Sequence, residues 1–395
     1  MKQRVIIIGY GFSSRLGIIR SLGELGYEIY VIAVEGNKKP IDCYSKYVKK
    51  FFLSYGNKSD EILRILLEEC TDKRHKPIVI PINDFSASVV DLNLDTLSRF
   101  FFIPNINNQQ GSVVDWMNKE KQKTAARHLG LRVAKSVNVE IRNHSFKIPT
   151  EVNYPCFTKT HAYVPGYKHT LHKCNNEEEL YVILNRLSEQ YETLTLMVED
   201  YKEIEKEFAV VGVSNGDDVI IPGVIEILSM AEGGVKGVAC HGIVKPVQGF
   251  EDLIELFSKL IKEIGLTGMF DIDFYLSGGE YYFCEINLRI GGSGYAVMKM
   301  GVNLPLLFVF MITGGSVDNL QKKVTGISAF VNERISSDNW YDGHMSTKSF
   351  LKMLKSSQIS FIRDENDPFP YRLFKRQLTT LYFKRCIKKW LKHIK

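Results

Sequence analysis

The chain has 395 residues, of which 45% are hydrophobic and 24% charged, so it is too long for one ordinary domain and has a globular composition. Residues 371–395 hold nine Lys and Arg and no Asp or Glu, so the net charge of +6 leaves the first 370 residues at −3. A slightly acidic body excludes nucleic acid as the expected main partner. No apolar run reaches the roughly 18 residues of a membrane-spanning helix.

Strand-like and helix-like segments alternate in the first third of the chain. Strands are expected at Val5–Ile8, Glu28–Val34 and Pro77–Ile82, and helices at Ser13–Leu25 and Asp60–Cys70. This βαβαβ order predicts a doubly wound, parallel sheet. The polar, turn-rich segment 105–111 follows it, so we place a domain boundary there.

Two glycines, Gly9 and Gly11, separate the first strand from the first helix. A dinucleotide fingerprint needs a third glycine at position 14, where this chain has Ser14, so the signal for a nicotinamide cofactor is weak. The helix N-terminus at Ser13, Ser14 and Arg15 can instead hold a substrate carboxylate or phosphate. A tight structural turn is the alternative.

A helix and then mainly antiparallel strands are expected after the boundary. The helix is Trp116–Gly130, ending at a glycine typical of a C-cap. The strands are Cys156–Thr160, Leu194–Glu199, Phe208–Val213 and Val219–Ile227. They are followed by an amphipathic helix at Phe250–Ile264, a hairpin of residues 268–276 and 281–286, and an apolar helix at Ala296–Thr313.

Oxygen ligands gather on the predicted hairpin. Asp271 and Asp273 lie on one face of its first strand, and Glu285, Asn287 and Arg289 lie on one face of its second. Carboxylates beside an amide suit Mg²⁺ that bridges triphosphate oxygens. The neighbouring arginine can neutralise a transferring phosphate or bind a carboxylate. The apolar residues between them argue against a solvated strand face.

Two lysines and one acidic segment lie at the ends of other elements. Lys119 begins the helix after the first domain, and Lys159 ends an apolar strand. The segment that ends the next strand, 197–202, offers the Glu199 carboxylate and backbone groups that can read a purine edge.

In this order the motifs resemble those of the ATP-grasp superfamily, and most closely its carboxylate–amine ligases similar to D-aspartate ligase. The residues that carry the resemblance are Asn118-Lys119, Tyr154-Pro155 with Lys159, Val198–Tyr201, Glu207, Asp273, Glu285-Ile-Asn287-Leu-Arg289 and Gly301-Val-Asn303. It covers about residues 1–320. The loop Thr160–His169 departs from the glycine-rich pattern of many members, because it holds a single glycine. His161, Lys168 and His169 are either phosphate contacts or part of a solvated loop.

The resemblance implies an α/β fold with a doubly wound N-terminal domain of the pre-ATP-grasp kind at 1–110. A two-lobed α+β ATP-grasp domain follows at 111–330, with a small central lobe at about 135–200. Residues 331–395 are expected to form a basic helical tail.

It also implies ATP and Mg²⁺, with Mn²⁺ as a substitute, together with a small-molecule carboxylate and an amine as substrates. Lys119 and Lys159 would contact the phosphates. The adenine would be held by Glu199, Tyr201 and Lys202, and the ribose by Glu207. The metal ligands would be Asp273, Glu285 and Asn287. Arg289 would lie at the acyl-phosphate, and Gly292 and Ser293 join Ser13, Ser14 and Arg15 as substrate candidates.

Other functions stay open. Within the superfamily these are a carboxylase or an enzyme that releases an acyl-phosphate. Outside it they are a NAD-dependent dehydrogenase, which leaves the carboxylate cluster unexplained, and a non-catalytic ATP sensor. The substrates and the oligomeric state are not encoded in the motifs.

The tail and the cysteines bear on location. Ile387, Trp390, Leu391 and Ile394 have helical spacing with lysines between them. Such a helix either lies on an anionic membrane surface or packs on the body with a solvated basic face, and we favour packing. Seven cysteines without a C-x-x-C pair favour a reducing compartment. We therefore expect a cytoplasmic protein, with peripheral membrane contact through 371–395 as the alternative.

Overall fold

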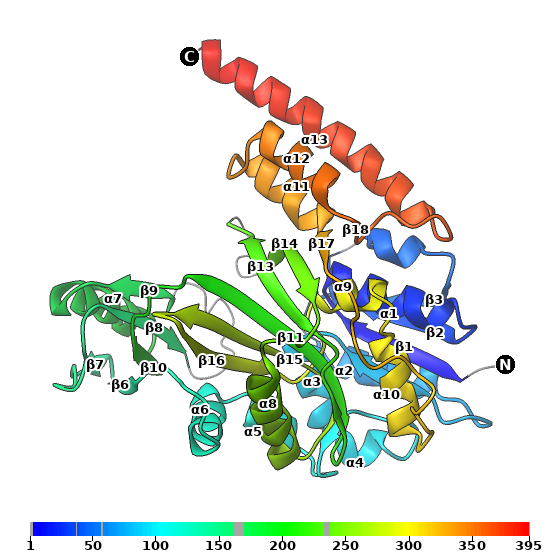
Figure 1. Ribbon diagram of the computed structural model, residues 1–395, viewed down its shortest axis with the longest axis horizontal. Coiled ribbons are helices and arrows are strands. Elements are labelled where there is room, and N and C mark those ends of the chain that lie inside the picture. The colour runs from blue at the N-terminus through cyan, green and yellow to red at the C-terminus, as the bar shows by residue number, and fades with distance from the viewer. Residues whose placement is uncertain (1–2, 37, 57, 161–169, 233–237, 395) are drawn as a thin grey trace. The chain divides into compact units, whose positions relative to one another are not determined.

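The computed structural model describes residues 3–36, 38–56, 58–160, 170–232 and 238–394, with side chains up to residue 385. Its elements are labelled in Figure 1. Its contacts divide the chain into two compact units. Unit 1 consists of Met1–Val114, Phe208–Asp271 and Asn287–Lys395, and unit 2 of Asp115–Glu207 and Ile272–Ile286. The predicted α/β class is confirmed.

The N-terminal part of unit 1 is a parallel sheet in the order β3-β2-β1-β4. Its strands are β1 (Arg4–Gly9), β2 (Glu28–Ala33), β3 (Val48–Leu53) and β4 (Ile78–Pro81). The residues Val5 to Ile8 have no exposed surface, as expected for a strand covered on both faces. Sequence analysis missed β3, because Lys49 and Lys50 interrupt its apolar pattern.

Helices and turns connect these strands. They are α1 (Phe12–Gly23), the turn Ile41–Tyr44, α2 (Ser59–Ile65) with the continuing turn Leu66–Cys70, α3 (Asp84–Asp91) and α4 (Leu94–Leu97). The strand order reverses at β1, since β2 and β3 lie on one side of it and β4 on the other. Ligands of doubly wound sheets bind outside the carboxyl ends of the strands at such a point. Here α1 begins after β1 and α3 begins after β4.

A second sheet of unit 1 runs in the order β15-β11-β13-β14-β17-β18, with β5 paired to β15 and β12 to β11. The strands are β5 (Asn105–Ile106), β11 (Lys206–Asn215), β12 (Val219–Ile220), β13 (Val224–Met230), β14 (Ala239–Lys245), β15 (Leu266–Ser277), β17 (Ser328–Val331) and β18 (Ile359–Ser360). The single strand predicted at Val219–Ile227 is wrong. It divides around Pro222, because proline lacks the N–H that a central ladder needs.

The helices after β14 are α8 (Glu251–Ile264), α9 (Gly294–Lys299) and α10 (Leu304–Ile312). α8 buries one stripe, formed by Phe257, Leu260, Ile261 and Ile264, as its pattern predicts. The single helix predicted at Ala296–Thr313 is wrong. It divides because Gly301 has φ 95°, outside the helical region, and Asn303 caps a new helix.

Unit 2 contains an antiparallel sheet in the order β7-β6-β10-β8-β9. Its strands are β6 (Ser136–Arg142), β7 (Ser145–Phe146), β8 (Cys156–Thr160), β9 (His172–Cys174) and β10 (Thr193–Asp200). Helix α7 (Glu177–Gln190) packs on it through the buried Leu180, Leu184 and Leu187. The unit also holds α6 (Lys119–His128) and the hairpin that joins the end of β15 to β16 (Glu280–Asn287). The short helix α5 (Ser112–Trp116) lies where the chain passes from unit 1 into unit 2.

The C-terminal segment of unit 1 contains α11 (Glu333–Asp342), α12 (Thr347–Ser356) and α13 (Phe369–Ile394). Trp340 of α11 stacks on Phe350 and on Tyr382, with ring centroids 5.6 and 6.4 Å away, and the Arg385 guanidinium lies 4.6 Å from its ring centroid. Figure 1 shows α13 running past α11 and α12. The tail is therefore packed as far as Arg385. In the described part of the chain, no helix is long and apolar enough to cross a membrane.

The buried guanidinium of Arg20 connects α1 to the segment before α13. It donates to the Asp367 carboxylate at 2.9 Å and to the carbonyl oxygens of Phe361, Ile362 and Asp367 at 3.0–3.2 Å. It also donates to the Tyr295 hydroxyl at 3.1 Å. Arg20 and Asp367 are almost fully buried, so this contact has no competing water and ties sequence-distant parts of unit 1 together.

We predict that Arg20→Met lowers the free energy of unfolding by about 3–5 kcal/mol, because it leaves the Asp367 carboxylate buried without its cation. The matched control is Arg64→Met, since Arg64 forms an exposed ion pair with Glu68 and should contribute less than about 1 kcal/mol. Urea unfolding of both variants measures the difference. Equal losses in the two variants would contradict the role given to Arg20.

Candidate active site

Predicted ATP-site residues of unit 2 lie near one partly buried thiol, that of Cys284 on β16. Burial raises the pKa of Cys284, and the charges of Lys159, Glu285, Asp273 and Lys119 also act on it. Two ammonium groups and two carboxylates from α6, β8, β15 and β16 thus lie within electrostatic reach of one point. The fold brings together residues that are up to 166 positions apart in the sequence.

Lys119 reaches β16 because α6 is fastened to that strand. The Gln122 side chain donates to the carbonyl of Ile286 and accepts from its N–H, both at 2.9 Å. Asn118 caps the helix by accepting from two backbone N–H groups of its first turn. With α6 held in this way, the Lys119 ammonium forms an ion pair with the Glu285 carboxylate.

Glu199 and Lys159 meet across neighbouring strands. Lys159 lies opposite Met197 in the β8–β10 pairing, so it is diagonal to Glu199 on the same face of the sheet. Its ammonium lies 3.0 Å from the Glu199 carboxylate, and both side chains are at most 10% exposed. A carboxylate expected to hold adenine is therefore paired with a lysine expected to hold phosphate.

A third member of this cluster, Lys123, was missed by the sequence analysis. Its ammonium contacts the same Glu199 carboxylate, and its side chain is 1% exposed. Burial and then the charge of Lys159 lower the pKa of Lys123 to about 6. One carboxylate balances only one ammonium, so the uncharged form of the second buried lysine is favoured. The available signal was its spacing of four residues from Lys119, which places both lysines on one face of α6.

The other nucleotide candidates lie around the same hairpin of unit 2. The Tyr201 N–H donates to the Pro155 carbonyl at 2.9 Å, so that N–H is not available to a ligand. The Lys202 ammonium lies 5.7 Å from the ring centroid of Tyr282 on β16. Glu207 is partly buried, and burial raises its pKa. The loop residues His161, Lys168 and His169 lie outside the described residues.

The donor set fits a magnesium ion. Asp273 and Glu285 supply carboxylates near Cys284, and Asn287 follows two residues after Glu285 on β16. These oxygen donors match the preference of Mg²⁺. In the described part of the chain, no group of three or more His, Cys, Asp and Glu is placed to hold a metal, so an amide or a ligand's own oxygens would have to complete the shell.

Arg289 lies in unit 1, beyond the end of β16. It donates to the Asp84 carboxylate at 3.0 Å and to the Asn287 amide oxygen at 3.1 Å. Asp84 is the first residue of α3, at the carboxyl end of β4. The guanidinium is therefore held at the strand edge where the reversal of strand order predicts a ligand.

The loop after Arg289 approaches α1 closely. A Cβ atom on Gly291 would lie 1.6 Å from an Asp271 carboxylate oxygen, so only glycine fits there. A Cβ atom on Gly292 would lie 3.6 Å from the Cβ of Ser13, and Ser293 follows directly. Substrate candidates that are far apart in the sequence of unit 1 thus lie side by side.

The N-terminus of α1 lies at this place. The Ser13 hydroxyl accepts from the Asn332 amide at 2.9 Å, and Ser14 is 5% exposed. Among the described residues no side chain caps α1, whereas Asn83 and Ser86 form a capping box on α3. The first N–H groups of α1 therefore remain available to an anion.

Arg15 is turned away from that role. Its guanidinium forms ion pairs with Asp42 and Glu35 and donates to the Gly9 carbonyl at 2.8 Å. Burial alone would lower the pKa of Arg15, but the charge and hydrogen bonds of Asp42, with Glu35, raise it overall. Its donors are thus occupied by protein groups.

A pocket of about 420 Å³ nevertheless lies beside Arg15 in unit 1. The exposed Lys38 and Lys39 line it, together with Arg334 of α11 and Gln377 of α13. The sequence analysis gave none of these four residues a function. They come from three separated segments, so no local motif marks them.

We predict that Lys123 makes stability depend on pH. A lysine with a folded pKa of about 6 and an ordinary unfolded pKa binds fewer protons in the folded state between about pH 6 and 10. Stability therefore rises with pH in that window, by about 1.4 kcal/mol per unit for one proton. Urea unfolding at pH 7, 8 and 9 should show this slope in the wild type but not in Lys123→Met.

The matched control is Lys121→Met. Lys121 lies on the same helix, but it is exposed and pairs with Asp115. This variant should keep the wild-type slope. If Lys123→Met also keeps it, Lys123 is protonated in the folded protein and the explanation is wrong.

Comparison with known proteins agrees with this geometry. Residues 235–334 match a family model described as "ATP-grasp in the biosynthetic pathway with Ter operon". The chain is also 28% identical over 185 residues to D-alanine–D-alanine ligase of Fusobacterium nucleatum. That match covers 44% of this chain and 57% of the ligase, so the chain spans little more than half the length of this curated relative.

Solved structures extend the similarity over most of the chain. N5-carboxyaminoimidazole synthetase of Staphylococcus aureus, complexed with ADP, has a TM-score of 0.62 at 18% identity, covering 83% of this chain and 82% of that one. Biotin carboxylase of Campylobacter jejuni has a TM-score of 0.64 at 17% identity, covering 83% and 75%. The chain therefore has the ATP-grasp fold, and the resemblance to the ATP-grasp superfamily inferred from its motifs is confirmed.

Proposed function

We propose that this protein is an ATP-dependent carboxylate–amine ligase that forms an amide and produces ADP and phosphate. The observation that carries the proposal is the cluster around Cys284, where Lys119, Lys159, Asp273 and Glu285 converge. Ammonium groups beside carboxylates are what a metal-bound triphosphate requires. The ATP-grasp fold supports the same assignment.

The lysines and carboxylates would exchange partners when the nucleotide binds. Lys119 now neutralises Glu285, and Lys159 neutralises Glu199. Phosphate oxygens would take over the two ammonium groups, which leaves Glu285 to hold the metal with Asp273 and Asn287. Bound Mg²⁺ would neutralise phosphate charge as the γ-phosphoryl group is transferred.

The adenine and ribose would lie against the remaining candidates of unit 2. Glu199, the carbonyl of Tyr201 and Lys202 offer polar groups to the base, and Glu207 offers a carboxylate to the ribose hydroxyls. Lys123 stays beside Glu199 when Lys159 turns to phosphate, so the buried carboxylate keeps a partner. Lys123 is a positioning residue in this scheme.

The carboxylate substrate would lie at the strand edge of unit 1, against the α1 N-terminus with Ser13 and Ser14 and the loop of Gly292 and Ser293. A carboxylate oxygen attacks the γ-phosphorus, ADP leaves, and an acyl-phosphate forms. The amine then attacks the acyl carbon, the carbon–oxygen bond to phosphate breaks, and the amine loses a proton. Arg289 would neutralise charge on the acyl-phosphate, which is electrostatic and not covalent catalysis.

A specific observation supports a second candidate, an ATP-grasp carboxylase. The two solved structures reported above are a carboxyaminoimidazole synthetase and a biotin carboxylase, whereas the curated relative joins two amino acids. We prefer the ligase with amino-acid-like substrates, because the motif pattern resembles the carboxylate–amine ligases.

Phosphate release from Mg·ATP separates these functions. The protein is incubated with a panel of amino acids and amines, singly and in pairs, with and without bicarbonate, and products are identified by mass. We expect release that needs an acid and an amine together and yields a mass equal to their sum minus water. Release that depends on bicarbonate establishes the carboxylase, and ATP binding without release under any condition establishes a sensor.

We predict that Glu285→Gln and Asn287→Ala each lower kcat about a thousandfold while the protein stays folded. Each change removes a metal donor and several kcal/mol of transition-state charge stabilisation. Glu280→Gln is the matched control, because Glu280 begins the same strand but is exposed and paired with Arg132. Near-normal turnover in both site variants would refute the metal assignment.

We also predict that Mg·ATP raises the melting temperature and NADH does not. A ligand at a hundredfold excess over its Kd stabilises the folded state by about 2.7 kcal/mol. The candidates from Lys119 to Asn287 form a nucleotide site, whereas Ser14 replaces a glycine of the dinucleotide fingerprint. Stabilisation by NADH alone would favour the dehydrogenase.

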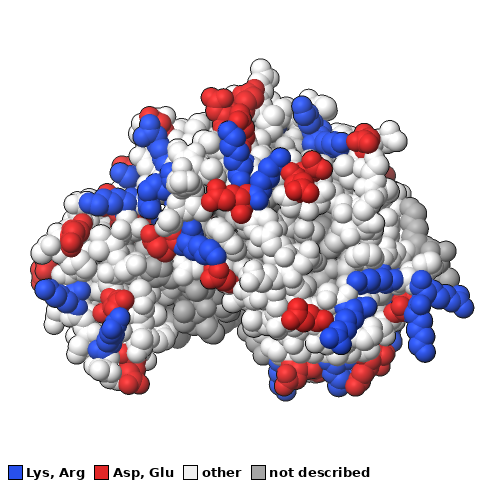
Figure 2. All heavy atoms as spheres, turned by 90° about the horizontal axis from the view of Figure 1, so that it is seen from below, with Lys and Arg blue, Asp and Glu red and all other residues white. Residues whose placement is uncertain are grey.

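The proposed location is the cytoplasm. The described cysteines are unpaired, including Cys156 and Cys174, which lie opposite each other on β8 and β9. Small-molecule carboxylates and amines are the proposed partners. Interspersed positive and negative side chains on the face shown in Figure 2 do not form a basic stripe for nucleic acid.

Membrane contact would involve only the end of the tail, because α13 is packed as far as Arg385. Residues 386–395 contain four lysines, and each contributes about 1 kcal/mol near an anionic surface. We predict weak vesicle binding, near millimolar, that is lost at 1 M salt and on truncation after Arg385. Co-sedimentation with phosphatidylserine vesicles measures it, and salt-resistant binding or full binding by the truncated chain would contradict it.

A further inference from the structure

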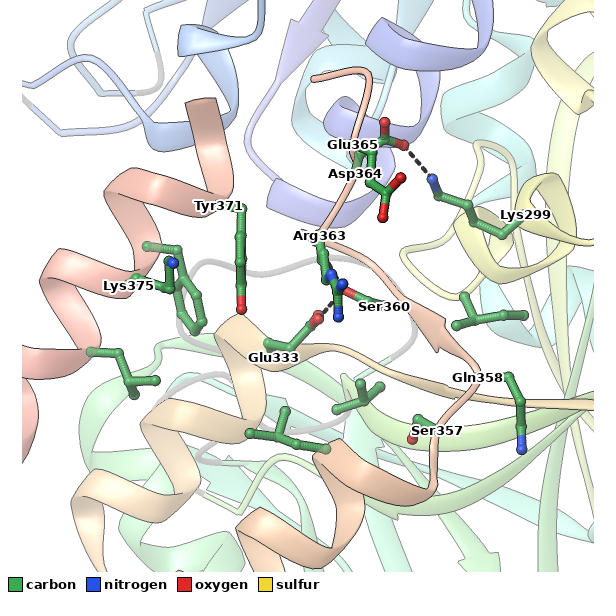
Figure 3. A pocket seen from close by; sticks show the side chains of 15 residues that line it. Lys299, Glu333, Ser357, Gln358, Ser360, Arg363, Asp364, Glu365, Tyr371 and Lys375 are labelled. Atoms are coloured by element: carbon green, nitrogen blue, oxygen red, sulfur yellow. Dashed lines mark hydrogen bonds and ion pairs between the residues drawn. The ribbon is translucent and has the colours of Figure 1, made fainter. Parts of the chain in front are cut away.

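A second pocket, of about 610 Å³, lies in the C-terminal part of unit 1 (Figure 3). It lies between the ends of α9, α12 and β17, the segment 357–365 and the first turns of α13. Its volume is in the range of small-molecule sites. In the described structure, none of the residues assigned above to nucleotide, metal or substrate lines it.

Glu333 gives this pocket a fixed wall. The Glu333 side chain is buried, and burial raises its pKa. Its carboxylate accepts from the Ser360 hydroxyl and from the backbone N–H groups of Phe361 and Ile362 at 3.1 and 3.3 Å. The acceptors of Glu333 are thus used to hold the segment after β18, which forms this wall of the pocket.

The remaining charges of the lining favour an anion. Lys299 is paired with Asp364. Arg363 and Lys375 have no carboxylate partner among the described residues, and Glu365 has no cationic one. Arg363 and Lys375 are therefore two exposed cations of the lining that an anion can pair with, although its three cations and three carboxylates balance in number. In Figure 3 the Arg363 guanidinium and the Tyr371 hydroxyl both point toward the Glu333 side of the pocket.

One part of the lining is apolar. Val331, Ile359 and Phe374 are buried side chains that border the pocket. The Tyr371 ring adds an aromatic surface, with the Lys375 ammonium 5.0 Å from its centroid. An inorganic ion would leave these groups uncovered, whereas a ligand with a hydrocarbon or ring body would bury them.

We propose that this pocket binds a small organic anion, in which a phosphate or carboxylate group meets Arg363, Lys375 and the Tyr371 hydroxyl while an apolar body lies against Val331, Ile359 and Phe374. A guanidinium pairs with either anion through two parallel hydrogen bonds. The site is independent of the proposed ligase reaction, since it shares none of its residues.

The test is calorimetric titration of the full chain with three probes at constant ionic strength: phenyl phosphate, benzoate and inorganic phosphate. Saturating Mg·ATP is present throughout, so that binding at the nucleotide site does not contribute. The variant is Arg363→Gln with Lys375→Gln. The matched control is Lys348→Gln with Lys352→Gln, which removes two exposed charges from α12 outside the pocket.

We expect phenyl phosphate or benzoate to bind the wild type and the control alike, and to bind the pocket variant at least tenfold more weakly. Inorganic phosphate should bind at least tenfold more weakly than phenyl phosphate. The relative strength of the first two probes decides between a phosphate and a carboxylate ligand. Tyr371→Phe should weaken binding without lowering the melting temperature.

Absence of binding by all three probes would overturn the proposal, as would equal binding by the wild type and the pocket variant. Equal affinity for phenyl phosphate and inorganic phosphate would contradict the proposed apolar body of the ligand, because charge alone would then explain binding. A melting curve of the pocket variant without probe accompanies the titration. An unchanged melting temperature shows that lost binding is not lost folding, since both substituted side chains are exposed.

Discussion

The buried guanidinium of Arg20 shows the constraint on which much of unit 1 depends: a charge removed from water must find its partners inside the protein. Asp367 supplies the opposite charge, and carbonyl oxygens of Phe361 and Ile362 accept the remaining protons. These partners lie more than 340 residues along the chain from Arg20. The requirement therefore fixes the C-terminal segment against α1, whose N-terminus is the proposed substrate site. Arg15 and Asp42 satisfy the same requirement within the first domain.

The same constraint is met only in part at the candidate active site of unit 2. Glu199 faces two buried lysines, but one carboxylate balances the charge of only one ammonium. The pKa of Lys123 therefore lies far below its ordinary value. The buried pair of Arg20 and Asp367, in contrast, joins one cation to one carboxylate. In the proposed scheme Lys159 turns to an arriving polyanion while Lys123 stays beside Glu199, and perturbed lysines are common at functional sites. The phosphates of a nucleotide are such a polyanion.

Local pattern was sufficient for much of this interpretation. Period-two spacing identified the β15–β16 hairpin and gave Asp273, Glu285 and Asn287 as candidate ligands. Continuous apolar runs identified the buried parallel strands. Errors arose where one residue type overrides a pattern: Pro222 divides a strand, and Gly301 divides a helix. The fold class and the resemblance to the superfamily are confirmed, whereas the domain limits and the roles of single residues stay predictions.

What the sequence could not show depends on contacts between distant segments. Lys123 has an ordinary helical position, and only the pairing of β8 with β10 explains why its ammonium is buried against Glu199. Arg15 has the residue type expected of an anion site, but Asp42 and Glu35 occupy its donors.

The structure also separates the shared chemistry from what is particular to this chain. In the proposed scheme, the carboxylate cluster and its lysines supply the ATP chemistry that the superfamily shares. Selectivity for the carboxylate substrate must depend on other residues, because these residues contact only nucleotide and metal in the proposed scheme. The two residues directly after β17 contact the substrate edge and the second pocket. Asn332 donates to Ser13 at the substrate edge, and the adjacent Glu333 shapes the second pocket. The proposed substrate edge and the second pocket therefore share no residue, but they meet at one point of the backbone, where Asn332 and Glu333 are neighbours.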